Sequence, residues 1–269
     1  MINRGFALLR AQPSLALYPM VFDLLLITAG AVFIGYQFQQ QFALELQPQF
    51  LLPSIEAILH DDQMMIFVNP ASATMGVEAG AAIILSIAFF FVFIFVEGGY
   101  LRLLYRRVEG ERIDVSTFLQ DGRRLFGRFL LVNVLVILLL VLGALLVLIV
   151  SSILPAAGIV LITLGVIAAI VFRYVFIFWE YTIAAEDMPV IEALGRSRLI
   201  RRRNDATTIG LLVVFILINV VLSITLNLLI NVPVLYVMTI LNAVIMTGVG
   251  LAFMSHYAEL RRQDPVHPE

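Results

Sequence analysis

Cysteine and lysine are both absent from the 269-residue sequence, and only 13% of its residues are charged. Without cysteine the chain has no disulfide bond, no thiolate nucleophile and no cysteine-ligated metal. Hydrophobic residues make up 61% of the chain and its mean hydropathy is +1.01, whereas soluble domains are about half apolar. The composition predicts an all-α, polytopic transmembrane helical bundle that forms one integral membrane domain over residues 1–269.

Six apolar segments are long enough to cross a bilayer as helices, for which about 20 residues are needed. The connectors at 151–158 and 230–234 are short, so they predict tight hairpins between antiparallel spans. The remaining sequence suffices for loops but not for a separate soluble catalytic domain. The predicted spans are residues 14–36, 77–100, 129–154, 157–181, 207–230 and 233–257.

All seventeen basic residues are arginines, and they are strongly segregated along the chain. Sixteen lie before the first span, between the second and third, between the fourth and fifth, or after the sixth. The positive-inside rule then predicts that both termini and the two arginine-rich loops are cytoplasmic. A cleavable signal peptide beginning with Arg4 and Arg10 is a disfavoured alternative, because Pro19 and Asp23 interrupt the apolar run.

The two arginine-rich loops share a pattern that predicts amphipathic helices at the inner membrane surface. Residues 115–129 follow a potential helix cap at Asp114 or Ser116, and residues 189–204 follow a similar apolar and basic order. One side of the first helix is apolar through Phe118, Leu125 and Phe129. Anionic lipid headgroups would stabilise such helices by about 1 kcal/mol per nearby arginine. The candidate headgroup contacts are Arg123, Arg124, Arg128, Arg198, Arg201 and Arg202.

Each arginine-rich helix precedes two antiparallel spans, and residues 4–19 carry a fainter version of the same pattern. This order predicts a tandem repeat of the second and third units, or a threefold repeat if the N-terminal third is included. The alternative is that basic helices resemble one another wherever the positive-inside bias operates.

The outer segment 37–75 contains acidic residues, glutamines and three prolines but no arginine. Ser54 is a suitable cap for a short helix with apolar residues on one face. We expect that helix to lie on the outer membrane surface. A lid over a cavity is the alternative.

Three ionisable residues lie inside the predicted spans, where a charge costs about 2.5–3.5 kcal/mol even on lenient scales. Helical rise places Asp23 and Arg173 about 13 and 12 Å from the inner edge, and Glu97 closer to it. The sequence therefore predicts an Asp23–Arg173 ion pair, with an Arg173–Glu97 contact as the competing arrangement. Such a pair would fix helix packing, or serve as a proton relay or part of a solute site.

A polar stripe follows the fifth predicted span at intervals of four residues, which places its members near one helix face. Its members are Asn219, Ser223, Asn227 and Asn231. On the sixth span, Thr239 and Asn242 lie one short turn of chain away. The stripe predicts hydrogen bonds between the two helices, typically about 0.6 kcal/mol each. The alternative is the hydrophilic wall of a cavity.

The segment EDMPVIEALGRSRLIRRRN (residues 186–204) resembles a large group of uncharacterised bacterial multi-pass proteins. These proteins are similar to the membrane domain fused to some glycerophosphodiester phosphodiesterases. Residues 97–99 (EGG) and 178–181 (FWEY) also look similar to that group. The resemblance implies a six-span fold in a bacterial cytoplasmic membrane. It implies no catalytic activity, because the soluble phosphodiesterase barrel is missing.

The sequence excludes most catalytic classes, because it has no phosphate-binding glycine loop, serine elbow or paired-carboxylate motif. The three histidines lack ligand spacing, so we expect neither a metal nor a cofactor. Nucleic-acid binding is not expected, while a protein partner or homo-oligomer stays open. We expect a non-enzymatic protein that organises lipid or binds a partner. A small-solute or lipid permease is the alternative, and a lipid-modifying enzyme is the least favoured.

Overall fold

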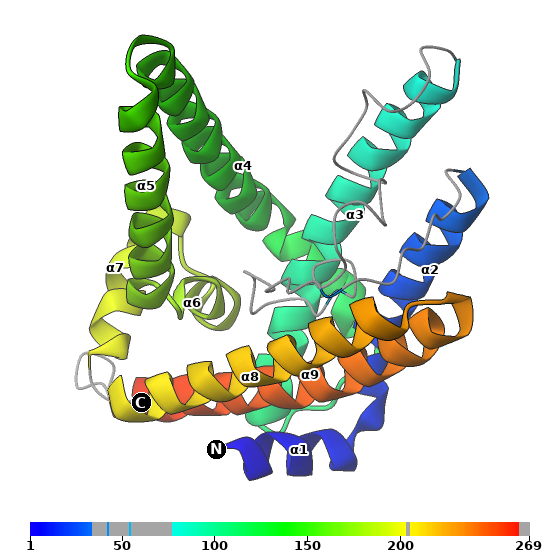
Figure 1. Ribbon diagram of the computed structural model, residues 1–269. Coiled ribbons are helices and arrows are strands. Elements are labelled where there is room, and N and C mark those ends of the chain that lie inside the picture. Colours follow the sequence, from blue (N-terminus) through cyan, green and yellow to red (C-terminus); the bar gives the residue numbers. More distant parts are fainter. Residues whose placement is uncertain (34–41, 43–53, 55–76, 203–204, 264–269) are drawn as a thin grey trace.

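The computed structural model describes residues 1–33, 42, 54, 77–202 and 205–263. Every regular element in these ranges is helical (Figure 1). The elements are α1 (Ile2–Ala11), the short 3-10 helix η1 (Pro13–Ala16), α2 (Leu17–Phe33), α3 (Val77–Val108), α4 (Val115–Ile153), α5 (Pro155–Val175), α6 (Trp179–Glu186), α7 (Val190–Arg201), α8 (Asp205–Leu229) and α9 (Val232–Arg262).

Five of these helical segments are long and apolar enough to cross a membrane. They are Ile87–Val108, Val115–Ile153, Pro155–Glu186, Asp205–Leu229 and Val232–Arg262. Ile2–Ala11 and Pro13–Ala29 meet at a bend of 101°, and counting this bent pair as one span raises the number to six. Each predicted span therefore contains a helix, and the chain is a helical membrane protein with five or six candidate spans.

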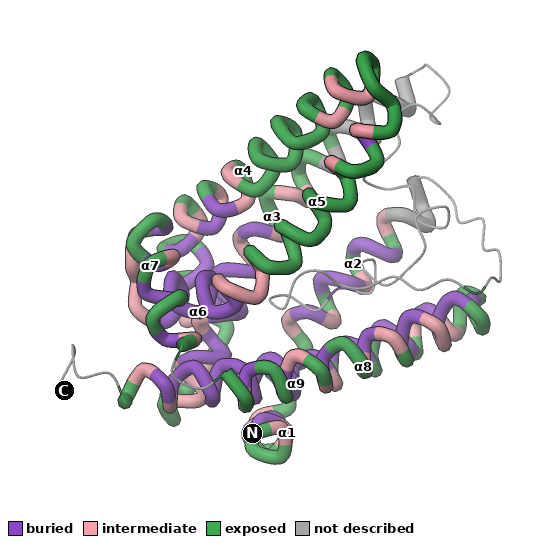
Figure 2. Tube along the Cα trace, turned by 60° about the vertical axis from the view of Figure 1, so that its left-hand side comes forward, coloured by how far each residue is buried: buried purple, intermediate pink, exposed green. Residues whose placement is uncertain are grey.

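Three helical hairpins diverge from a common base (Figure 1). They are formed by α2 with α3, α4 with α5, and α8 with α9. We define the base as α6, α7, the C-terminal ends of α3 and α9, and the N-terminal end of α4. Figure 2 shows buried residues concentrated in this base, and mostly exposed residues along α4 and α5.

The α4–α5 hairpin exposes apolar side chains along almost its whole length. In the most apolar 18-residue stretch of Val115–Ile153, none of the residues is buried. In the corresponding stretch of Pro155–Glu186, only 6% are buried. An apolar surface of this extent would aggregate in water. Lipid is therefore the solvent that this hairpin requires.

The helix predicted at 115–129 is present, but it is the first part of α4 and does not end before the span. Asp114, one of the two residues predicted to cap this helix, does so. The predicted apolar side of this helix, formed by Phe118, Leu125 and Phe129, is buried. It faces α3 and not the membrane surface. A Cβ at Gly99 would lie 2.9 Å from the Phe118 ring, so glycine permits this close approach. The expectation of a separate helix with this side on the membrane is wrong.

Helix α1 packs against α9 through two glycines. A Cβ at Gly5 would lie 2.3 Å from the Gly248 carbonyl oxygen, and one at Gly248 would lie 2.6 Å from the Phe6 ring. An ion pair between Arg4 and Glu259 adds to the contact. The start of the chain and the end of α9 therefore lie on the same side of the molecule.

The fourth predicted span, 157–181, is broken. Helix α5 ends at Val175, and α6 begins at Trp179 after three turn residues. The break turns Phe178 into the base, where its ring lies 5.7 Å from the Tyr257 ring. The Trp179 indole Nε1 donates to the Val190 carbonyl, 2.8 Å away, and so joins α6 to α7. Aromatic packing in the base explains a break that has no proline or glycine.

Helix α7 is a separate element, as the second arginine-rich loop predicts. Its buried residues include Val190, Ala193, Ser197 and Ile200, which recur at helical spacing and pack within the base. Ile191 points outward and is 67% exposed. The outer helix predicted within 37–75 lies outside the described residues, and the internal repeat stays a prediction.

The cap of α4 predicts a pH-dependent stability. The Thr117 backbone N–H and the Ser116 hydroxyl donate to the Asp114 carboxylate, which lowers the pKa of Asp114 below its ordinary value. The ionised Asp114 cap therefore stabilises the folded protein fully above the ordinary aspartate pKa of about 4. This stabilisation is lost as pH falls through the lowered pKa of Asp114. Asp114→Ala should lower the melting temperature at neutral pH, and the difference from wild type should narrow in acid. Glu192→Ala, which removes an exposed acid from α7, is the control. An Asp114→Ala difference that does not change with pH would contradict this account.

Candidate functional site

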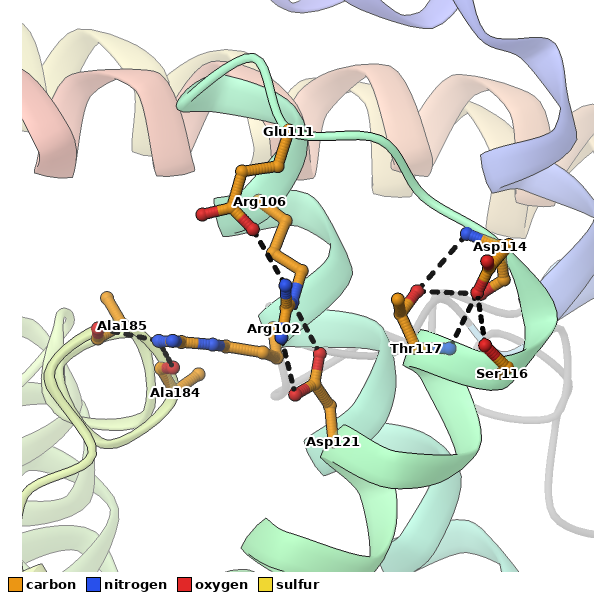
Figure 3. A network of polar contacts seen from close by, with 9 residues as sticks. All are labelled: Arg102, Arg106, Glu111, Asp114, Ser116, Thr117, Asp121, Ala184 and Ala185. Atoms are coloured by element: carbon orange, nitrogen blue, oxygen red, sulfur yellow. Dashed lines mark hydrogen bonds and ion pairs between the residues drawn. The ribbon is translucent and has the colours of Figure 1, made fainter.

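The base is held together at the C-terminal end of α6 (Figure 3). The Arg102 Nη1 group donates to the carbonyl oxygens of Ala184 and Ala185, each 2.7 Å away. These carbonyls lie in the last turn of a helix, where a cation also interacts favourably with the helix dipole. Arg102, which follows the apolar part of α3, thereby fixes α6 against that helix.

A carboxylate at the end of α6 joins three further elements. Glu186 Oε1 accepts from the Tyr257 hydroxyl at 2.6 Å and lies 3.6 Å from Arg261 Nε. Its Oε2 accepts from Arg196 Nε at 3.4 Å. Arg261 in turn binds the Tyr105 hydroxyl of α3. Glu186 therefore links α6, α7, α9 and, through Arg261, α3.

A second ion pair closes the turn between α3 and α4 (Figure 3). Arg106 binds both oxygens of buried Asp121, at 2.7 and 3.1 Å, and also binds Glu111. A two-point contact of this kind is the strong form of an arginine–carboxylate pair. It sets the register in which α4 packs along α3.

The six arginines predicted to contact headgroups divide into two sets. Arg124 and Arg128 bind Asp187, which follows α6 in the left-handed conformation with φ of 54°. Arg201 binds Asp205 and lies over the Tyr174 ring, 4.7 Å from its centre. The second set is exposed and has no ion pair among the described residues: Arg123, Arg198 and Arg202.

Arg173 pairs with Glu180 across the α5–α6 break, and Glu97 of α3 interacts electrostatically with both. Asn133 Nδ2 of α4 donates to Glu97 Oε2 at 3.2 Å. We call these four side chains the Glu97 cluster. Asp23 is instead buried on α2 and accepts from the Ser54 hydroxyl at 3.0 Å. Figure 1 places α2 and α5 on opposite sides of α3. Arg173 thus pairs with Glu180, an acid that neither predicted arrangement named, and the Asp23–Arg173 pair stays a prediction.

The polar stripe on α8 is fully buried through Asn219, Ser223 and Asn227. Asn219 and Asn227 each donate to the carbonyl four residues earlier, at 3.0 and 2.9 Å. Asn231, predicted as a fourth member, lies beyond α8 and caps α9 by accepting from the Val234 backbone N–H. The stripe is thus shorter than predicted, because the chain turns at Asn231.

Asn242 on α9 is the polar residue of this hairpin that is least satisfied. It is 0% exposed, and neither Nδ2 nor Oδ1 has a hydrogen-bond partner in the described structure. Asn219 Oδ1 is likewise buried without a partner there. Counted from the cap at Asn231, Asn242 and Asn219 lie at similar heights, about 16 and 18 Å along their helices. The hairpin therefore carries two incompletely satisfied amides at one depth.

Sequence reasoning missed the residues that organise the base, namely Arg102, Asp121, Glu180 and Glu186. Each is a charged residue near a span end. The sequence predicts that the arginines in these regions contact lipid headgroups. The acids were the available signal, because Asp121 lies between the arginines of the first loop, and Glu186 and Asp187 precede those of the second. They neutralise part of the basic charge within the protein.

The described part of the chain holds no group of three or more His, Asp or Glu side chains able to bind a metal ion. A family model described as a domain of unknown function, DUF7847, matches residues 1–259. The chain belongs to the DUF7847 family. The match gives no sign of a glycerophosphodiester phosphodiesterase fusion. No curated protein and no solved structure matches the chain.

The Glu186 contacts predict a large effect of one substitution. Glu186→Ala should lower the free energy of unfolding in detergent by about 3–5 kcal/mol, because it removes a buried carboxylate that accepts from both Tyr257 and Arg196. Glu109→Ala, which removes the exposed partner of Arg262, should cost only about 0–1 kcal/mol. Equal losses in the two variants would show that Glu186 does not anchor the base.

The unsatisfied amide predicts a stabilising substitution. Asn242→Leu should raise the free energy of unfolding by about 1–3 kcal/mol, since it removes a buried polar group without partners. Asn227→Leu is the matched control and should not stabilise, because the Asn227 amide already donates to Ser223. If Asn242→Leu destabilises the protein, a polar group absent from the described contacts satisfies Asn242.

Proposed function

We propose that this DUF7847 protein is a non-enzymatic membrane protein that binds anionic lipid headgroups at the cytoplasmic surface. The observation that carries the proposal is the set of exposed arginines on α4 and α7 at the foot of an apolar hairpin. Arg123, Arg198 and Arg202 are exposed without an ion pair among the described residues. Such cations beside a lipid-covered surface attract headgroup phosphates.

The neighbouring surface supports a lipid as the occupant. Leu119 near Arg123 is 52% exposed, and Ile191 and Leu199 on α7 are 67% and 57% exposed. A surface that alternates exposed arginines with exposed aliphatic side chains suits the boundary between headgroups and acyl chains. A soluble anionic partner would need the arginines but not the aliphatic groups.

The proposal places the base and both termini in the cytoplasm of a bacterial cell, with the chain in the inner membrane. The arginine distribution supports this orientation through the positive-inside rule. The Arg4–Glu259 ion pair brings the start of the chain to the end of α9.

A second candidate is a small-solute or lipid permease that uses the α8–α9 hairpin. The observation that favours it is the pair of incompletely satisfied amides, Asn219 and Asn242, at one depth of the hairpin. A transported polar solute would supply the missing hydrogen-bond partners. Solute-dependent stabilisation of wild type that is lost in Asn242→Leu would support this candidate over lipid organisation.

Lipid binding is tested with the full-length chain in nanodiscs. Arg123→Gln/Arg198→Gln/Arg202→Gln should weaken binding of phosphatidylglycerol about 100-fold, because about 1 kcal/mol is lost per arginine. Native mass spectrometry measures the bound lipid, with phosphatidylcholine as the neutral comparison. Arg10→Gln/Arg112→Gln/Arg262→Gln removes the same charge elsewhere. If this control loses as much binding, net charge alone accounts for the affinity and the proposed surface is wrong.

A further inference from the structure

The Glu97 cluster brings two buried carboxylates against a single cation. The Glu97 residue is 2% exposed and Glu180 is 5% exposed, and the two interact electrostatically with each other. Arg173 is the cation in range of both, and its hydrogen bond goes to Glu180. With both acids ionised, the cluster carries one excess negative charge. A charge buried in this way is costly unless it is neutralised.

The hydrogen bonds distinguish the two acids. Glu180 receives the guanidinium of Arg173, while Glu97 receives only the neutral amide of Asn133, at 3.2 Å. Glu180 Oε2 is buried and has no hydrogen-bond donor in the described structure. Glu180 is therefore the acid that pairs with the cation, and Glu97 has no charged hydrogen-bond partner among the described residues.

We propose that Glu97 binds one proton, so that it is a neutral carboxylic acid beside the Arg173–Glu180 ion pair. The proton comes from water on the side of the base. It balances the charge of the cluster. The site is a proton-binding site at the junction of α3, α4, α5 and α6, and it is independent of the proposed lipid surface.

The other elements packed on α3 bring no second cation to Glu97. Helix α9 presents Thr247 to the Tyr100 hydroxyl at 2.8 Å, and α2 carries Asp23, which accepts from Ser54. Tyr181 of α6 interacts electrostatically with Arg173, Glu180 and Tyr100. None of these groups supplies a positive charge. Among the described residues, Arg173 is thus the one cation that interacts with Glu97.

The first test uses the wild-type protein and needs no variant to fold. A hydrophobic carbodiimide reacts with protonated carboxyl groups, and peptide mass spectrometry locates the modified residue. We expect labelling of Glu97 at neutral pH, decreasing as pH rises, with Glu180 unlabelled. Labelling of Glu180 without Glu97 would overturn the assignment. Protection of Glu97 by sodium chloride but not by choline chloride would overturn it too, because the ligand would then be a metal cation.

The second test compares two isosteric variants. Glu97→Gln replaces a neutral acid with a neutral amide of the same shape, so it should retain the wild-type melting temperature. It should also remove the carboxylic-acid band from the infrared spectrum. Glu180→Gln is the matched control and should lower the melting temperature, because Arg173 loses its anion. A wild-type spectrum without that band, or an equal loss of stability in both variants, would show that Glu97 is ionised.

Discussion

Arg102 binds the last carbonyls of α6, and the adjacent Glu186 binds Tyr257 and Arg196. The other elements of the base depend on this junction, because α6 contacts α3, α4 and α7 there. Helix α6 has only eight residues, too few to be stable by itself in water. Its partners therefore define its position, and α6 in turn defines where α5 ends. A short helix anchored by charge thus fixes the directions of the longer apolar ones.

The solvent explains why charge is concentrated in one region. A bilayer offers no water to unpaired polar groups, so ionic contacts stabilise the protein best where the spans end. The α4–α5 hairpin illustrates the same rule. Beyond its base it exposes aliphatic side chains, and its ion pairs in the described structure are at the base, through Asp121, Arg124, Arg128 and Arg173. Lipid therefore completes a structure whose protein contacts lie mainly at one end.

The sequence predicted what depends on local pattern. Hydropathy located a helix in each predicted span, and spacing identified both the Asp114 cap and the buried side formed by Phe118, Leu125 and Phe129. It could not decide what covers that side, because a helix presents the same pattern to lipid and to α3. The glycines at 98 and 99, which admit the Phe118 and Phe129 rings, were the distinguishing signal. The Arg173–Glu180 pair was missed for a related reason, since a continuous helix was assumed through a break that tertiary aromatic packing creates.

The Glu97 cluster lies where α5 gives way to α6, so its charge state and the geometry of the base are linked. Arg173 belongs to the apolar hairpin and Glu180 to the anchored helix, while Asn133 connects Glu97 to α4. With Glu97 neutral, it does not compete with Glu180 for Arg173, and α5 stays joined to α6. An ionised Glu97 would draw the Arg173 guanidinium toward α3 and weaken that joint. Proton occupancy would then change the stiffness of the hairpin at its foot.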